Sequence, residues 1–231
     1  MNWFQLDAES VASRVQASGR PADVPSLASS LCRGIIGFPI ISLAGFAPWA
    51  IGGRWFYKNL GEAGLYGVCA LVFIATSGLV MHRLIIGPGS LSRFYKLFSL
   101  AFAAYSVAWM AGWMALRGHP GSIVGLLAGT ILMGLILTWA FNVRDQALRV
   151  IIALFVLNSA GYFIGGWVEA MGASMAGISL TRSTQAMLSK SLWGVCYGLG
   201  LGAGLGLAFY LCQARTRALL QSKPLIDANK R

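Results

Sequence analysis

Long runs of apolar residues, separated by short polar and charged clusters, dominate the pattern along this chain. The runs reach about twenty residues, the length that a helix needs to cross the roughly 30 Å hydrocarbon core of a bilayer. Strict alternation of apolar and polar residues, which marks a membrane β-barrel, is absent from the sequence. The pattern therefore predicts an all-α integral membrane protein, a bundle of about six transmembrane helices. The predicted spans are residues 34–53, 64–86, 94–116, 122–141, 150–168 and 191–212.

The first twenty residues are too polar to span a membrane, yet they carry a stripe of apolar side chains. These side chains recur at intervals of three or four residues, the spacing of one helix face. They are Phe4, Ala8, Val11 and Val15. The spacing favours an amphipathic interfacial helix, and a partly ordered polar tail is the alternative. The expected parts of the chain are a cytoplasmic amphipathic segment, a transmembrane domain and a basic cytoplasmic tail, over residues 1–30, 31–213 and 214–231.

Composition agrees with lipid as the main solvent, because 57% of the residues are apolar and 11% are charged. A water-soluble domain would carry about 25% charged residues. The net charge of +11 would suggest a nucleic-acid partner for a soluble domain. In a membrane protein, however, Lys and Arg gather on the cytoplasmic side and face anionic lipid headgroups. We therefore expect the bilayer, with anionic headgroups on the cytoplasmic side, as the partner, and no nucleic acid.

The distribution of basic residues predicts the orientation in the membrane. An even number of spans places both termini on one side. Thirteen of the eighteen Lys and Arg residues fall on the side of the termini, and the other five fall on the opposite side. Positive residues favour the cytoplasmic face, so the sequence predicts a multi-pass protein of the inner membrane with both termini in the cytoplasm.

The second, fourth and sixth predicted spans begin alike. Their first residues read Gly64-Leu-Tyr-Gly67, Ser122-Ile-Val-Gly125 and Ser191-Leu-Trp-Gly194. These matches favour three helical hairpins in parallel orientation, and repeats of this kind occur in transporters. Chance similarity between apolar segments is the alternative.

Glycines spaced four residues apart are the most specific pattern in the chain. Small residues at this spacing let two helix backbones approach closely inside a membrane. The expected packing glycines are Gly121, Gly125 and Gly129 in the fourth span, and Gly194, Gly198, Gly202 and Gly206 in the sixth. Three interpretations remain open: packing within the bundle, contact with another copy or a partner membrane subunit, and a glycine-lined path for a ligand.

Asn158 in the fifth span is the most polar side chain at predicted bilayer depth. A buried amide needs hydrogen-bond partners, and the hydroxyls of Thr76, Ser77 and Thr130 are predicted to lie at comparable depth. We expect either an interhelical hydrogen bond or one wall of a small polar pocket. The candidate ligand-binding residues are Asn158, Ser159, Tyr162, Thr130, Tyr105 and Trp109.

The sequence offers no pattern for catalysis or for a cofactor. The predicted topology places His82 and His119 on opposite sides of the membrane, and the cysteines have no metal-ligand spacing. No acidic or basic residue lies at the middle of a predicted span, which disfavours an ion-driven mechanism. We therefore expect no metal, no cofactor and no catalytic residue, and a non-enzymatic protein.

Two functions remain open at the level of the sequence. The first is a protein that binds or passes a small neutral or apolar ligand, based on the repeat, on Pro39 inside the first span and on the group around Asn158. The second is an accessory or structural subunit of a larger membrane complex, based on the glycine rows. The surroundings of the glycines in the sixth span discriminate between the two.

Overall fold

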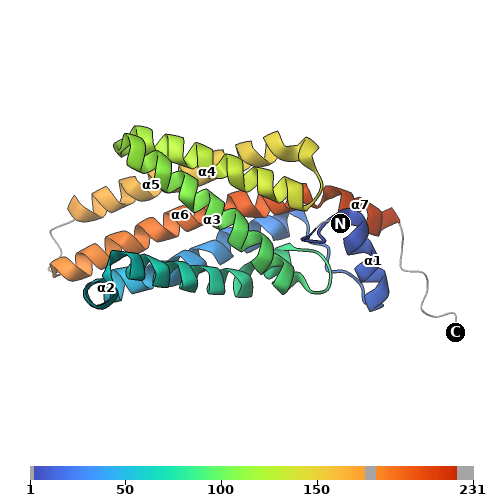
Figure 1. The fold of residues 1–231 in the computed structure, drawn as a ribbon, viewed down its shortest axis with the longest axis horizontal. Helices are drawn as coiled ribbons and strands as arrows, with labels where there is room; N and C mark the ends of the chain where they lie inside the picture. The colour runs from blue at the N-terminus through green and yellow to red at the C-terminus, as the bar shows by residue number, and fades with distance from the viewer. Residues whose placement is uncertain (1–2, 175–180, 223–231) are drawn as a thin grey trace.

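Long helices make up the bundle in Figure 1, a computed structural model that describes residues 3–174 and 181–222. The helices are α1 (Ala8–Ser18), α2 (Leu27–Met81), α3 (Ser90–Leu116), α4 (Gly118–Ala140), α5 (Ala147–Ser174), α6 (Arg182–Cys212) and α7 (Ala214–Ser222). Two short 3-10 turns, η1 (His82–Leu84) and η2 (Arg144–Gln146), join α2 to α3 and α4 to α5. The end of the predicted basic tail, residues 223–231, lies outside the described residues.

Among residues 3–174 and 181–222, the structure confirms six helices that are long and apolar enough to cross a membrane. Two of them belong to α2, because Gly61 adopts a non-helical backbone conformation with φ of 70° and divides that helix. The six are Leu27–Gly61, Gly64–Leu84, Ser90–Leu116, Gly118–Ala140, Arg144–Met171 and Thr184–Cys212. Five of them begin before the predicted apolar runs, whereas the second and the fourth end two residues and one residue before the predicted ends. Side chains cap some of the helix starts. The Ser26 side chain, for example, accepts a hydrogen bond from the Ser29 backbone at 3.1 Å.

Consecutive helices pack as hairpins, and α6 lies between α2 and α5. In the α3–α4 hairpin, a Cβ added to Gly112 would lie 2.7 Å from the Gly125 backbone. In the α5–α6 hairpin, a Cβ added to Gly161 would lie 2.8 Å from Gly200. Helix α6 is the most enclosed of the six spans, since it contacts helices on two sides. The bundle is thus held together by close backbone approaches at glycine.

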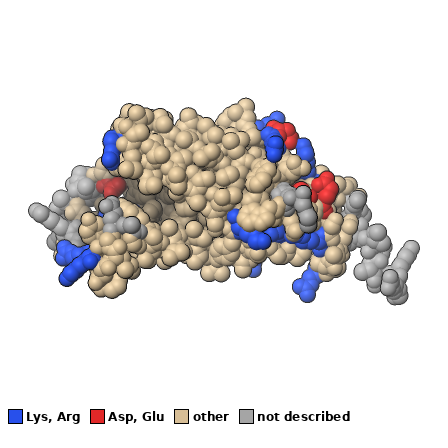
Figure 2. Space-filling model, in the orientation of Figure 1, with Lys and Arg blue, Asp and Glu red and all other residues tan. Residues whose placement is uncertain are grey.

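The outer surface of the bundle suits a lipid environment. Figure 2 shows Lys and Arg at the two ends of the molecule, with an uncharged band between them. Large apolar side chains along the helices are exposed, and Ile36, Leu71 and Val107 are examples. An exposed apolar surface of this kind is unfavourable in water and favourable against lipid tails.

Helix α1 forms where the sequence predicts it, but its apolar face does not lie open for a membrane. Val11 and Val15 are buried against Ile86, and Leu220 of α7 packs on the same cluster. Phe4, which precedes α1 and lies outside the helix, is also buried and meets Trp139 edge to face, with 5.5 Å between ring centroids. The helix predicted to lie at the membrane surface therefore covers one end of the bundle. Its apolar side chains pack against other residues of the protein. In Figure 1, α1 and α7 lie together at one end of the molecule.

Candidate functional site

The structure brings Tyr105 of α3 and Asn158 of α5 together inside the bundle. The Asn158 side-chain amide donates a hydrogen bond to the Tyr105 hydroxyl at 2.9 Å. Tyr197 of α6 donates to the same hydroxyl at 3.4 Å. Asn158 is 0% exposed, and both tyrosines are buried as well. Three helices that are distant in sequence thus share one hydrogen-bonded group, which we call the tyrosine–asparagine cluster.

A second layer of aromatic side chains lies one helical turn further along the bundle. Trp109 follows Tyr105 by four residues on α3, and Tyr162 follows Asn158 by four residues on α5. The Trp109 and Tyr162 rings have centroids 6.2 Å apart, and Tyr162 meets Trp193 of α6 at 5.6 Å. The Tyr162 hydroxyl also lies 3.2 Å from the Ser122 hydroxyl of α4. This aromatic layer covers the tyrosine–asparagine cluster on one side.

Three buried polar atoms in and beside these layers have no hydrogen-bond partner within the described residues. They are the side-chain oxygen of Asn158, the indole nitrogen of Trp109 and the hydroxyl of Ser159. A buried polar atom without a partner costs about 1 to 3 kcal/mol, and native proteins keep few of them. The Asn158 oxygen can accept a hydrogen bond, and the Trp109 nitrogen can donate one. A ligand that contacts both atoms would therefore need a hydrogen-bond donor for the Asn158 oxygen and an acceptor for the Trp109 nitrogen.

Thr130, a predicted site residue, takes no part in the tyrosine–asparagine cluster. Its hydroxyl donates to the carbonyl oxygens of Leu126 and Leu127 in its own helix, at 2.8 and 3.1 Å. Thr76 and Ser77 likewise donate to carbonyls of α2, three or four residues earlier. Helical Ser and Thr commonly bond in this way. None of these three hydroxyls is the partner of Asn158. The interhelical hydrogen bond, which was one of the two expected alternatives for Asn158, forms with Tyr105.

Sequence reasoning did not assign Tyr197, Trp193 or Ser122 to the site. Trp193 and Tyr197 are four residues apart on α6, and their rings stack with centroids 5.2 Å apart. That spacing places both rings on one helix face, so an aromatic pair within the glycine-rich span was the available signal. Ser122 has no such signal, because its contact with Tyr162 depends on how α4 and α5 pack.

The glycines of α6 face helices of the same chain. A Cβ added to Gly198 would lie 2.6 Å from Pro39 of α2. Gly202 meets the Gly34 backbone, and Gly206 meets Ser30, both also in α2. Gly194 faces the Phe46 ring, so this whole row lies against the first span. In α4, Gly121, Gly125 and Gly129 lie against Trp113, Trp109 and Tyr105 of α3, respectively.

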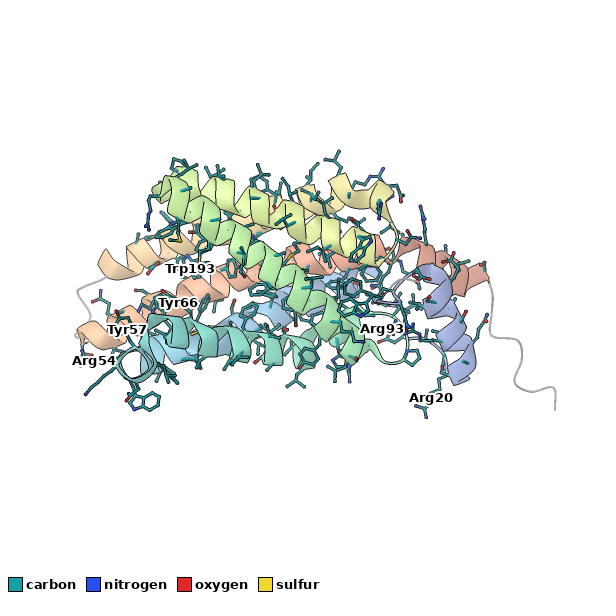
Figure 3. All side chains as sticks on the ribbon, in the orientation of Figure 1. Arg20, Arg54, Tyr57, Tyr66, Arg93 and Trp193 are labelled. Atoms are coloured by element: carbon teal, nitrogen blue, oxygen red, sulfur yellow. The ribbon has the colours of Figure 1, made fainter. Side chains whose placement is uncertain are left out.

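The surface of the molecule is hollowed near the aromatic layer. Figure 2 shows the hollow in the left half of the view, between the α3–α4 side and the α2–α6 side of the bundle. Figure 3 labels Trp193 in the same part of the view. Trp193 is partly exposed, whereas Tyr197 one turn deeper is buried. The two rings therefore extend from the hollow towards the tyrosine–asparagine cluster.

Within residues 3–174 and 181–222, no group of three or more His, Cys, Asp or Glu side chains is arranged to hold a metal ion. Comparison with protein families, with curated proteins and with solved structures finds no match for this chain.

Proposed function

We propose that this chain is a multi-pass membrane protein that binds a small neutral ligand at the tyrosine–asparagine cluster. The observation that carries the proposal is the pair of unpartnered buried atoms, the Asn158 oxygen and the Trp109 indole nitrogen, beside a layer of aromatic rings. The rings favour an apolar body, and the two atoms favour one acceptor and one donor on the ligand. The hollow beside Trp193 gives a ligand a way in from the surface.

The glycine contacts favour ligand binding over the accessory-subunit alternative. Glycine rows that assemble a complex would lie on the outer surface of the single chain. Gly198, Gly202 and Gly206 instead pack against the backbone of α2. Their close approach is therefore used within the chain, where it holds α6 and its two aromatic side chains in place.

The setting of this protein is part of the proposal. The excess of Lys and Arg on the side of the termini favours an inner membrane with both termini in the cytoplasm. In that orientation the hollow lies towards the outer half of the membrane. The cluster contains no Asp, Glu, His, Lys or Arg side chain, so passage of a ligand would follow its own concentration gradient. A contact with another copy of the chain would use lipid-facing side chains rather than the glycine rows.

A thermal-unfolding series in mild detergent tests the proposal. Wild type is compared with Trp109→Phe and Ser159→Ala, each with and without native lipid extract and a panel of small neutral amphiphiles. Ser159→Ala removes an unpartnered hydroxyl, so it should unfold at the wild-type temperature or higher without ligand. Trp109→Phe also replaces a packed indole by a smaller ring, so its rise with ligand is measured from its own ligand-free unfolding temperature. A ligand that binds the native state raises the unfolding temperature by mass action. We expect that rise in wild type, and a smaller rise in Trp109→Phe.

Thr138→Val is the matched control, because the Thr138 hydroxyl is buried and bonds to carbonyls of its own helix α4. It should keep the full ligand-dependent rise. If no compound or extract raises the unfolding temperature of wild type more than that of Trp109→Phe, the ligand site is rejected and the accessory-subunit function replaces it.

A further inference from the structure

A cleft separate from the tyrosine–asparagine cluster opens at the end of the molecule that carries α1 and α7. Its volume is ≈490 Å³, within the range of small-molecule sites. One wall consists of the last turn of α1 and the segment that follows it, including Ser18, Arg20 and Asp23. The other wall consists of η1 and the loop before α3, including His82 and Arg83. We call it the terminal cleft.

The charges that face the terminal cleft are mainly positive and lack acidic partners. The guanidinium groups of Arg20 and Arg83 are exposed, and neither has a hydrogen-bond or ion-pair partner among the described residues. Asp23 is the acidic residue in the lining, and it forms an ion pair with Arg33 at 3.0 Å. Its charge is therefore already balanced, and two arginines remain free to bind an anion.

The wall formed by residues 84–89 is held in place from behind by Arg93 and Gln213. Arg93 is 6% exposed and donates to the carbonyl oxygens of Ile86, Gly87 and Pro88 at 3.2, 3.1 and 2.6 Å. These carbonyls point to the buried guanidinium, so they do not present negative dipoles to the cleft. Gln213 accepts from the Ile86 backbone at 2.8 Å and donates to the Leu84 carbonyl at 2.7 Å. A wall fixed in this way loses little conformational freedom when a ligand binds.

Two further features at the same place favour an anion. Arg93 supplies a positive charge behind the loop with no acidic partner among the described residues, since its side chain donates to backbone carbonyls. Ser90, which lines the cleft, begins α3, and the N-cap residue Gly89 provides no side-chain hydrogen bond to that helix end. The first backbone N–H groups of α3 therefore remain as donors beside the arginines.

We propose that the terminal cleft binds a phosphate group, with Arg20 and Arg83 as its charged ligands and Ser90 as a hydroxyl donor. Arginine binds phosphate oxygens through paired N–H groups, a geometry that a chloride ion does not use. The phosphate belongs to a lipid headgroup or to a soluble phosphate compound, because both bring the same chemistry to this end of the molecule. This site is independent of the ligand proposed for the tyrosine–asparagine cluster.

Binding is tested with purified full-length protein in mild detergent, by thermal unfolding and by native mass spectrometry. The probes are inorganic phosphate, with sodium chloride at equal ionic strength as its match, and dioctanoyl phosphatidate, with dioctanoylglycerol as its match. The double variant Arg20→Gln with Arg83→Gln removes two exposed charges from the cleft. Arg54→Gln with Lys58→Gln removes two exposed charges from the opposite end, where Figure 3 labels Arg54.

We expect at least one phosphate probe to raise the unfolding temperature of wild type more than its phosphate-free match does. The cleft double variant should keep the wild-type unfolding temperature without probe and bind that probe at least about tenfold more weakly. The Arg54 and Lys58 variant should bind like wild type. A response to phosphatidate alone shows that the cleft binds a lipid headgroup. A response to inorganic phosphate shows that a soluble phosphate compound is sufficient for binding. Equal losses in both double variants, or no response beyond the matched controls, would overturn the proposal.

Discussion

At the scale of single residues, each polar group inside this bundle needs a hydrogen-bond partner from the protein, because water does not supply one. Ser and Thr side chains are short enough to bond to their own helix, and Thr130 and Thr138 do so. The Asn158 amide is instead paired across the bundle with Tyr105. A long aromatic side chain can bridge α3 and α5, whose backbones do not pack closely. The hydrogen bond therefore depends on the positions of both helices.

Tyr105→Phe tests this bridge, because it removes one hydroxyl and leaves the ring. Asn158 and Tyr197 would both lose the acceptor that they now share. We expect the free energy of unfolding to fall by about 1 to 3 kcal/mol. The measurement is thermal or denaturant unfolding in detergent.

Tyr66→Phe is the control for the loss of a hydroxyl, since Tyr66 is exposed on the second span. It should leave the stability unchanged. Equal stability of wild type and Tyr105→Phe would show that the buried hydroxyl contributes nothing to the fold.

At the scale of helices, the apolar runs were enough to locate all six spans, because length and hydropathy alone decide which segments can cross a membrane. The lateral order of the spans could not be predicted in this way. Lipid-facing and protein-facing apolar side chains look alike in a sequence, and Gly198 and Gly166 differ only in what lies opposite them. The partner of Asn158 was missed for the same reason, since Tyr105 is brought to it by the packing of α3.

Substitution of Gly202 tests the contact between α2 and α6. A Cβ at this position would overlap the Gly34 carbonyl and approach the Phe38 side chain. Because the obstacle includes backbone, it cannot be relieved by a change of rotamer. We expect Gly202→Ala to destabilise the bundle by about 1 to 3 kcal/mol and Gly202→Leu by more, measured as loss of folded protein after extraction.

Gly166→Leu in α5 is the matched substitution, because nothing lies within 4 Å of a Cβ added there. Expression and unfolding temperature should remain at the wild-type level. If Gly202→Leu behaves like Gly166→Leu, the close approach of α2 and α6 is not required.

At the scale of the whole molecule, the distribution of charge and the number of spans constrain the orientation together. The part of the chain that the structure describes has six span-length helices, with α1 and α7 at one end of the molecule. In the topology inferred from the sequence, most Lys and Arg residues lie on the side of the termini. An uncharged band separates the two ends of the molecule in Figure 2. This combination favours insertion in a single orientation.

Reporter fusions test that orientation. A reporter attached to either terminus, or inserted at residues 87–89 or after Asn142, should report the cytoplasm. One inserted at the turn around Gly118, between α3 and α4, should report the opposite side. A C-terminal fusion that reports the outside would contradict the six-span topology.

The contact between α1 and α7 has a consequence for how the protein is made. Val11 and Val15 are synthesised before the six spans, and Leu220, which packs on their cluster, is synthesised after all six. Membrane helices can insert one after another as they are translated, but this contact cannot form until Leu220 has been made. Gln213, which fixes the loop around Ile86, also follows the last span. The end of the molecule that holds the terminal cleft is therefore completed only after the sixth span has been made, and until then the nascent chain carries the apolar stripe of α1 without its α7 partner.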